Sequence, residues 1–357
     1  MAIMPPAFKS RFSTIADSER PSPFQETKAF DAFFICQSFK GITPYIHLKL
    51  DLMLKNFSPS ALGINGRQSE LIELALTYGF SGMDVDMHEM LRRAQRTNVE
   101  DAAKYLEAAK IEVGGFELGL DLDADEDAFT SEIGGLHPIA DMAKQLGATR
   151  GYIRVPAATN RLPYHEYFDV QGTRLAQVAQ VLEPRGIQLG IGFSAGKELE
   201  EDREFAFVRN VEGFLALVNS VAGDNVGMLL DTWDWVVGEG TMEQLGKVSA
   251  EKIIAVRLGS LHSEAEIEKA TSSERVLPEQ EGGLNHVDVI KHLAEIGFQG
   301  PVSPSASNQS YKGQTRESIV QRAQEAVDGI SKEAGLVVAK LPMETIDDIP
   351  YEPNPIS

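Results

Sequence analysis

From residue 53 onward, the chain alternates between short apolar runs and longer segments whose apolar residues recur every three or four positions. Short apolar runs bounded by turn residues are typical of buried strands, and the longer pattern is typical of amphipathic helices. The apolar runs predict eight strands, at residues 58–62, 80–86, 111–120, 150–155, 187–193, 226–232, 253–259 and 301–305.

A helix is predicted after each of these strands. The helical segments are residues 71–78, 99–110, 139–146, 175–182, 205–221, 242–248, 287–296 and 318–330. Strict alternation of strand and helix implies a parallel sheet, and eight units suit a closed (β/α)8 TIM barrel of the α/β class. A dinucleotide-binding sheet would need a GxGxxG turn after its first strand, but residues 63–66 are Gly-Ile-Asn-Gly.

Charge and composition divide the chain into three parts. Residues 1–52 hold six Lys and Arg against five Asp and Glu, whereas the whole chain has a net charge of -20. Because these residues show no sustained period, we interpret 1–52 as a disordered N-terminal extension, or as sequence upstream of a true start at Met53. Residues 53–336 form the predicted barrel, and residues 337–357 a C-terminal tail.

The composition also excludes several classes of function. An acidic chain is a poor ligand for nucleic acid or for an anionic membrane, because both need clustered Lys and Arg. Cys36 is the single cysteine, so the chain can form neither an internal disulfide nor a cysteine zinc site. The absence of any apolar run of about 18 residues excludes a membrane span. These features are consistent with a cytoplasmic protein. They do not exclude that the chain forms a homo-oligomer.

Polar residues stand where the predicted strands end, which is where TIM barrels place their active sites. They are Glu117 after the third strand, Arg154 after the fourth, Asp231 and Asp234 after the sixth, and Arg257 in the seventh.

Four segments together resemble the sugar phosphate isomerase/epimerase family, which has a xylose-isomerase-like barrel. NVGMLLDTWDW (225–235) is similar to the family's sixth strand, and RVLPEQEGGLNHVDVIKHLAEIGFQGPVS (275–303) to its Arg-x-Leu-Pro turn and entry into strand eight. IQLGIGFSAGKEL (187–199) and LIELALTYGFSGMDVD (71–86) resemble strand five and the first helix with strand two. The resemblance covers residues 55–335 and implies an enzyme that moves a proton next to a sugar carbonyl.

That chemistry implies a divalent cation such as Mn²⁺ or Mg²⁺ held by Glu, Asp, His and Glu on strands five to eight. Matched by position, these residues are Gly192, Asp231, Arg257 and Ser305 here, and the family's substrate-binding His is Asp234. One carboxylate cannot hold such an ion. The resemblance therefore predicts that the metal is lost, that there is no cofactor, and that Arg257 pairs with Asp231 or Asp234 instead.

We assign candidate catalytic roles to Asp231, Asp234 and Glu117. The candidate substrate-binding residues are Arg154, Arg257, Arg275, which matches the family's Arg-x-Leu-Pro arginine, and Trp233, which could stack on a sugar ring or pack in the core. Glu117 could act as a base or pair with Arg154. We expect His88 to begin a loop and to be exposed to solvent. The other histidines, which show no ligand spacing and are expected to be solvated or to cap helices, are His47, His137, His165, His262, His286 and His292.

Three functions are consistent with these residues. The first is an isomerase or epimerase of a carbohydrate with altered chemistry. The second is a non-catalytic barrel that binds a sugar or a protein partner. The third is a lyase or hydrolase in which the acidic residues at the mouth have taken on different catalytic roles. The fold supports all three equally, and the missing acid–base pair favours the second or an altered form of the first.

Overall fold

Eight parallel strands close into a barrel in the computed structural model, which describes residues 53–262, 265–278 and 283–341. The strands are β1 (Leu54–Phe57), β2 (Gly82–Asp84), β3 (Glu112–Glu117), β4 (Arg150–Arg154), β6 (Gln188–Gly192), β8 (Val226–Asp231), β9 (Ile253–Leu258) and β12 (Pro301–Pro304). Each strand pairs with its neighbours in parallel, and β12 pairs with β1 to complete the ring. The predicted TIM barrel is confirmed. Residues 1–52 and 342–357, interpreted above as extension and tail, lie outside the described residues.

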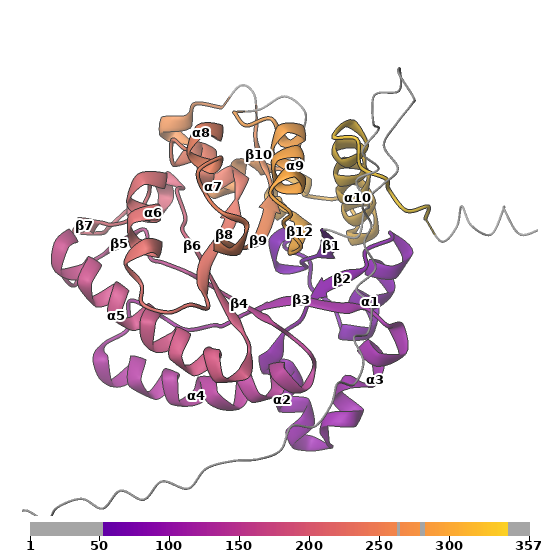
Figure 1. Ribbon diagram of the computed structural model, residues 1–357, viewed down its shortest axis with the longest axis horizontal. Helices are drawn as coiled ribbons and strands as arrows, with labels where there is room; N and C mark the ends of the chain where they lie inside the picture. Colours follow the sequence, from indigo (N-terminus) through magenta and orange to yellow (C-terminus); the bar gives the residue numbers. More distant parts are fainter. Residues whose placement is uncertain (1–52, 263–264, 279–282, 342–357) are drawn as a thin grey trace, which may run out of the picture. The chain divides into compact units, whose positions relative to one another are not determined.

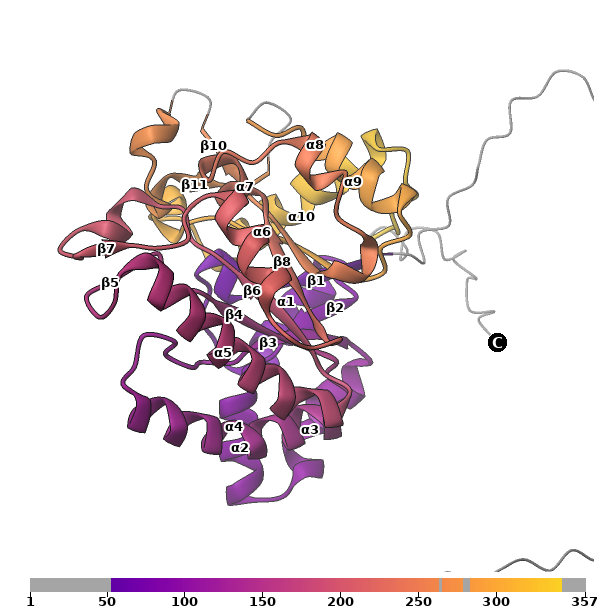
Figure 2. The ribbon, with the colours of Figure 1, turned by 60° about the vertical axis from the view of Figure 1, so that its left-hand side comes forward.

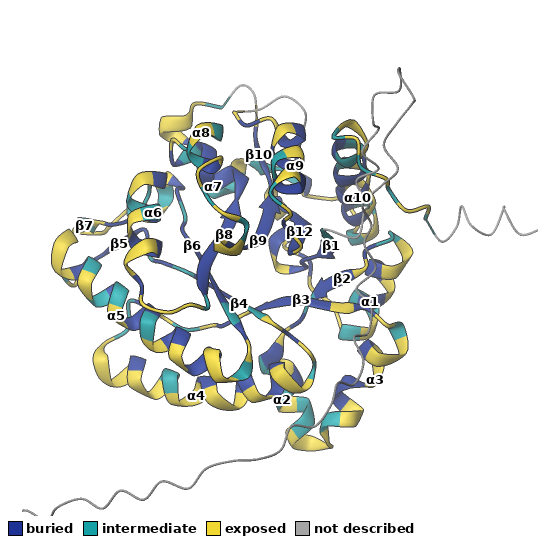
Figure 3. Cartoon of the chain, in the orientation of Figure 1, coloured by how far each residue is buried: buried dark blue, intermediate teal, exposed yellow. Residues whose placement is uncertain are grey.

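Helices surround the barrel, with their apolar faces on the strands (Figures 1 and 3). They are α1 (Gln68–Thr77), α2 (Met87–Arg96), α3 (Val99–Ala109), α4 (Glu126–Gln145), α5 (Tyr164–Leu182), α6 (Val211–Ser220), α7 (Thr232–Val237), α8 (Met242–Leu245), α9 (His286–Glu295) and α10 (Arg316–Glu333). None of the described helices is long and apolar enough to cross a membrane.

Two short antiparallel sheets join loops that follow the barrel strands. One pairs β5 (Ala158–Thr159) with β7 (Phe205–Ala206), and the other pairs β10 (Ser260–Leu261) with β11 (Arg275–Val276). Figure 2 shows both on the left-hand side of the barrel strands. Because β11 is tied to β10 directly after β9, Arg275 is brought to the C-terminal end of the barrel, which we call the mouth.

Three predicted elements need correction. The first strand is Leu54–Phe57 rather than 58–62, because Pro59 lacks the N–H that a central strand must donate and the chain turns into a 3-10 helix at Ser60–Leu62. The helix predicted at 205–221 begins only at Val211, where the Asn210 side chain caps it. Residues 87–96, which had no predicted helix, form α2.

The interior of the barrel is filled by side chains. Tyr152 lies there with Leu229, Ile254 and Ala255, all buried. The Tyr152 hydroxyl donates a hydrogen bond to the carbonyl oxygen of Gly114 at 3.1 Å, and burial raises its pKa well above the ordinary value of 10.0. A Cβ at Gly115 would lie 2.2 Å from the Tyr152 hydroxyl oxygen. Glycine is therefore required at this position of β3 for the tyrosine to fit.

Gly115→Ala tests this packing. We expect it to destabilise the fold by about 1–3 kcal/mol, because the added methyl group overpacks the interior against Tyr152. Gly134→Ala is the control, since a Cβ at this exposed helical glycine meets nothing within 4 Å and should stabilise by about 0.5–1 kcal/mol. Urea unfolding midpoints measure both, and equal effects of the two substitutions would contradict the packing of Tyr152 described here.

Candidate functional site

Four charged residues from β4, β8, α7 and β11 form a cross-linked cluster at the mouth, which we call the tetrad. Arg154 at the end of β4 lies 2.7 Å from Asp234 and 2.9 Å from Asp231, measured between guanidinium nitrogen and carboxylate oxygen. Arg275 lies 2.9 Å from Asp234 and 3.4 Å from Asp231. Each arginine therefore contacts both aspartates, and each aspartate contacts both arginines.

The remaining carboxylate oxygens of the tetrad accept backbone hydrogen bonds. Asp231 Oδ1 accepts from the N–H groups of Trp233 and Asp234 and so caps α7. Asp234 Oδ1 accepts from the N–H of Ala195 at 3.0 Å. Only 2% and 1% of the two aspartate side chains are exposed. All four carboxylate oxygens of the two aspartates thus have hydrogen-bond donors within the protein.

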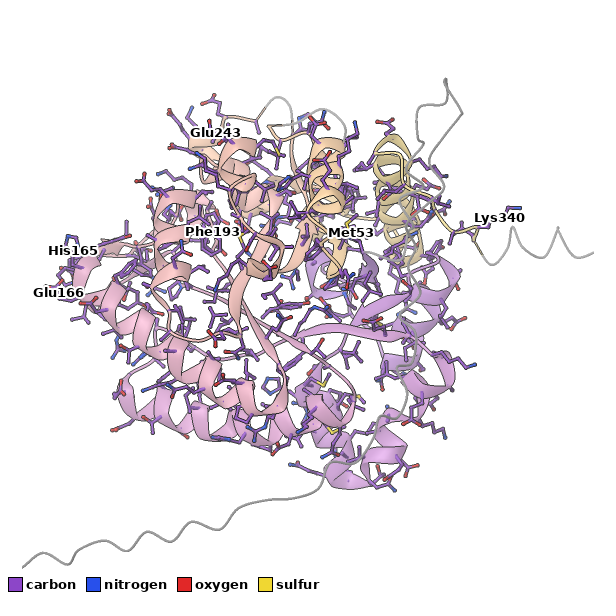
Figure 4. All side chains as sticks on the ribbon, in the orientation of Figure 1. Met53, His165, Glu166, Phe193, Glu243 and Lys340 are labelled. Carbon is purple, nitrogen blue, oxygen red and sulfur yellow. The ribbon has the colours of Figure 1, made fainter. Side chains whose placement is uncertain are left out.

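Small residues and one tryptophan make room for the two arginines. Arg154 lies opposite Gly192 in the register of β4 and β6, and a Cβ at Gly192 would lie 3.3 Å from Arg154 Cγ. Arg154 also donates to the carbonyl oxygen of Phe193 at 2.7 Å, a residue labelled in Figure 4. The Arg275 guanidinium carbon lies 4.8 Å from the centroid of the Trp233 ring, which is fully buried, so the arginine covers this ring face.

Arg257 on β9, next to Asp231 in the register of β8 and β9, forms a second cluster with residues of β2 and β3. Its Nη2 donates to Glu117 Oε1 at 2.5 Å and lies 3.9 Å from Asp84 Oδ2. The guanidinium carbon is 5.6 Å from the Tyr152 ring centroid, within the range of a cation–π contact. Asp84 in turn accepts a hydrogen bond from Asn56 Nδ2 at 2.9 Å.

The two clusters shift carboxyl pKa values in opposite directions. Burial alone would raise the pKa of Asp231, but the charges of Arg275 and Arg154 outweigh it and lower the pKa below the ordinary 3.8. At Asp84, burial wins over Arg257 and raises the pKa. Asp231 is therefore a strongly held anion, whereas burial favours the neutral form of Asp84.

Both ion pairs predicted for these residues are wrong. Arg257 was expected to pair with Asp231 or Asp234, but Arg154 and Arg275 already contact both aspartates, and Arg257 extends across Tyr152 towards β2 and β3. Glu117 was the alternative partner of Arg154, yet it pairs with Arg257. The cause is the same in both cases: a long arginine side chain can reach past its neighbouring strand.

Two histidines differ from expectation. His286, expected to be solvated or capping, is 1% exposed, and its Nε2 lies 3.0 Å from Thr232 Oγ1 and 3.3 Å from the carbonyl oxygen of Gly259. His88, interpreted as a loop residue, belongs to α2 and contacts the carbonyl oxygen of Leu118. The predicted residues that meet at the mouth are therefore acids and arginines, without a histidine.

Sequence reasoning missed Asn56 and Tyr152, which support the Arg257 cluster from inside the barrel. Asn56 donates to Ser303 Oγ as well as to Asp84. A correct first strand would have revealed Asn56 as an inward-facing polar residue, whereas Tyr152 carries no distinctive pattern.

No group of three or more His, Cys, Asp or Glu within the described ranges is arranged to hold a metal. Ser305, at the family's strand-eight position, is fully buried and lies 3.5 Å from Arg275 Nη1. A cavity of about 170 Å³ lies elsewhere, beside Met53 and between α9 and α10, and the tetrad does not line it.

Comparisons with known proteins agree with this architecture. Residues 72–332 match the family described as Xylose isomerase-like TIM barrel, and the chain belongs to this family. It is 22% identical over 272 residues to an inosose isomerase of Bacillus velezensis, covering 74% of this chain and 92% of that protein. An inosose isomerase of Bacillus subtilis is 27% identical over 162 residues, covering 44% and 54%.

Solved structures show the same fold. A xylose isomerase domain protein from Alicyclobacillus acidocaldarius superposes with a TM-score of 0.71 at 22% identity, covering 79% of this chain and 99% of that chain. The IOLI protein, solved with a bound zinc atom, gives a TM-score of 0.67 at 22% identity, with the same coverage of both chains. At these identities the likeness establishes the fold.

Asp231→Asn and Asp84→Asn should have opposite effects on stability at pH 7. The first leaves Arg154 and Arg275 with half their compensating charge and should cost about 3 kcal/mol. The second removes a carboxylate whose raised pKa shows that the fold favours its neutral form, so stability should be unchanged or higher. Urea midpoints at pH 7 measure both.

The pH dependence gives a further check on the same pair. Stability from Asp231 is present above pH 3.8 and is lost as the pH falls through its lowered folded pKa, so Asp231→Asn should flatten the acid limb of the stability curve. Stability linked to Asp84 is lost as the pH rises above 3.8. A larger loss from Asp84→Asn than from Asp231→Asn at pH 7 would contradict these assignments.

Proposed function

We propose that this chain binds a carbohydrate or related polyol at the barrel mouth, and that it does so without a divalent metal ion. The observation that carries the proposal is the saturation of Asp231. Its carboxylate, the one match to the family's metal ligands, is already bonded by Arg154, Arg275 and two backbone N–H groups. A cation could reach it only by breaking these bonds.

The neighbouring positions do not fit a metal either. Hard divalent ions take six or more oxygen or nitrogen ligands, whereas Gly192 offers no side chain and Arg257 is itself a cation. The guanidinium groups of Arg154 and Arg275 place two positive charges beside Asp231. The residues around Asp231 therefore do not fit a divalent metal ion.

The chemistry of the mouth favours a polyhydroxylated ligand. Sugar hydroxyl groups both donate and accept hydrogen bonds, and the mouth presents guanidinium donors beside the exposed carboxylate of Glu117. Two relatives from Bacillus, which match 74% and 44% of this chain, are named inosose isomerases. An inosose is a ketone derivative of a cyclic polyol. These features support a sugar or inositol-like ligand over a protein partner.

Binding should not depend on metal. We expect saturable binding of at least one member of a panel of neutral sugars, inositols and inososes, with the same affinity before and after treatment with EDTA, measured by calorimetry. The two tryptophans provide a second readout, because Trp233 lies under Arg275 whereas the Trp235 indole donates to the carbonyl oxygen of Thr241. A ligand at the mouth should shift the indole NMR signal of Trp233 more than that of Trp235.

Tight 1:1 binding of Zn²⁺ or Mn²⁺ that Asp231→Asn abolishes would overturn metal independence. Loss of sugar binding in EDTA with recovery on adding metal would do the same. If no sugar or polyol of the panel binds, carbohydrate binding itself is wrong.

One observation favours a catalytic form of this function. Glu117 is 44% exposed as a side chain, in contrast to the buried aspartates of the tetrad. It is therefore the carboxylate at the mouth best placed to accept a proton from a bound substrate, while Asp231 and Asp234 orient the arginines.

Proton exchange tests this candidate. Incubation of keto-sugars and inososes in deuterated water should exchange the proton next to the carbonyl, and Glu117→Gln should slow the exchange at least 100-fold, in line with general-base catalysis. Glu112→Gln is the matched control, because Glu112 is an exposed glutamate at the other end of β3. Binding without exchange would identify a non-catalytic barrel.

A further inference from the structure

We propose that Glu117 is a specificity-determining residue: by occupying Arg257, it makes the mouth select neutral ligands and reject carboxylated or phosphorylated ones. The inference rests on the proposed carbohydrate binding and adds the chemical class of the ligand. It follows from how each arginine at the mouth is compensated.

The tetrad offers no free positive charge to an anionic ligand. Its two arginines share two buried aspartates, and every carboxylate oxygen already has a donor. Arg154 is 24% exposed and Arg275 15%, but the charge of each is already balanced, and a ligand phosphate could replace that counter-charge only by displacing an aspartate that is buried and held by backbone N–H groups. Breaking such a pair leaves a charge buried without its partner, which is strongly unfavourable.

Arg257 differs because its close partner is exposed. The arginine side chain is 7% exposed, and Tyr152 and Asp84 hold it in place. Glu117 is 44% exposed and pairs with it from the end of β3. Of the ion pairs described at the mouth, this is the one that a ligand carboxylate or phosphate could enter, by taking the position of the Glu117 carboxylate.

Glu117 opposes that exchange by its own charge. An anionic ligand approaching Arg257 meets the Glu117 carboxylate first, and like charges placed together repel each other. A neutral sugar meets no such repulsion, and its hydroxyl groups can donate to the same exposed carboxylate. The side chain that excludes anions therefore also offers an acceptor to polyols.

Calorimetry with inorganic phosphate tests the role of Glu117 independently of which sugar binds. Wild-type protein should bind phosphate weakly, and Glu117→Gln should bind it at least tenfold more tightly because the competing charge is gone. The double variant Glu117→Gln with Arg257→Gln should lose that gain, which places the site at Arg257. Glu112→Gln, with the same change of charge about 16 Å away along β3, should behave as wild type since salt screens charges at that distance.

A matched pair of sugars extends the test to the ligand class. D-glucose and D-glucuronate differ in one carboxylate, so Glu117→Gln should shift the ratio of their affinities towards glucuronate by about tenfold. Thermal unfolding of each variant shows that it is folded.

The outcomes separate the two proposals. If wild type binds phosphate or glucuronate more tightly than D-glucose, or if folded Glu117→Gln gains no affinity for phosphate, Glu117 does not exclude anions, whether or not sugars bind. If the phosphate pattern across the four proteins is as expected but no neutral sugar or polyol binds wild type, the exclusion of anions stands and carbohydrate binding fails.

Discussion

The arrangement of charged side chains at the mouth of this barrel depends on two buried aspartates. A carboxylate removed from water is tolerated only when charge and hydrogen bonds replace its hydration, and Asp231 and Asp234 obtain both from Arg154, Arg275 and nearby backbone N–H groups. Arg154 and Asp234 are 80 residues apart in the chain. Because Arg275 neutralises the two aspartates at the start of α7, these ion pairs also hold the loop that carries Arg275 against the barrel.

The second cluster follows a different rule. Arg257 is more buried than either arginine of the tetrad, but its close partner Glu117 stays in contact with water. A pair with one exposed member can exchange that member, whereas a pair buried on both sides cannot do so without unfolding part of the site. The mouth thus combines a fixed charged framework with a single adjustable position, a division suited to ligand recognition.

The barrel could be predicted from the sequence because its signal is spread over some 280 residues and survives local errors. The site could be predicted only in part. The ends of β3, β4, β8 and β9 place Glu117, Arg154, Asp231 and Arg257 at one end of the barrel. Their pairing could not be predicted, because an arginine reaches several ångströms in directions that depend on the side chains around it.

Gly192 carries a consequence for how this site could change. The Arg154 side chain crosses the face of this glycine, with its Cγ 3.3 Å from where a Cβ would stand. A glutamate introduced here would crowd Arg154, which would have to shift by a few tenths of an ångström. Removing Arg154 first would deprive both aspartates of a counter-charge. Either first step disturbs the tetrad, so a glutamate at the strand-five position and the present packing of Arg154 are coupled features that would have to change together.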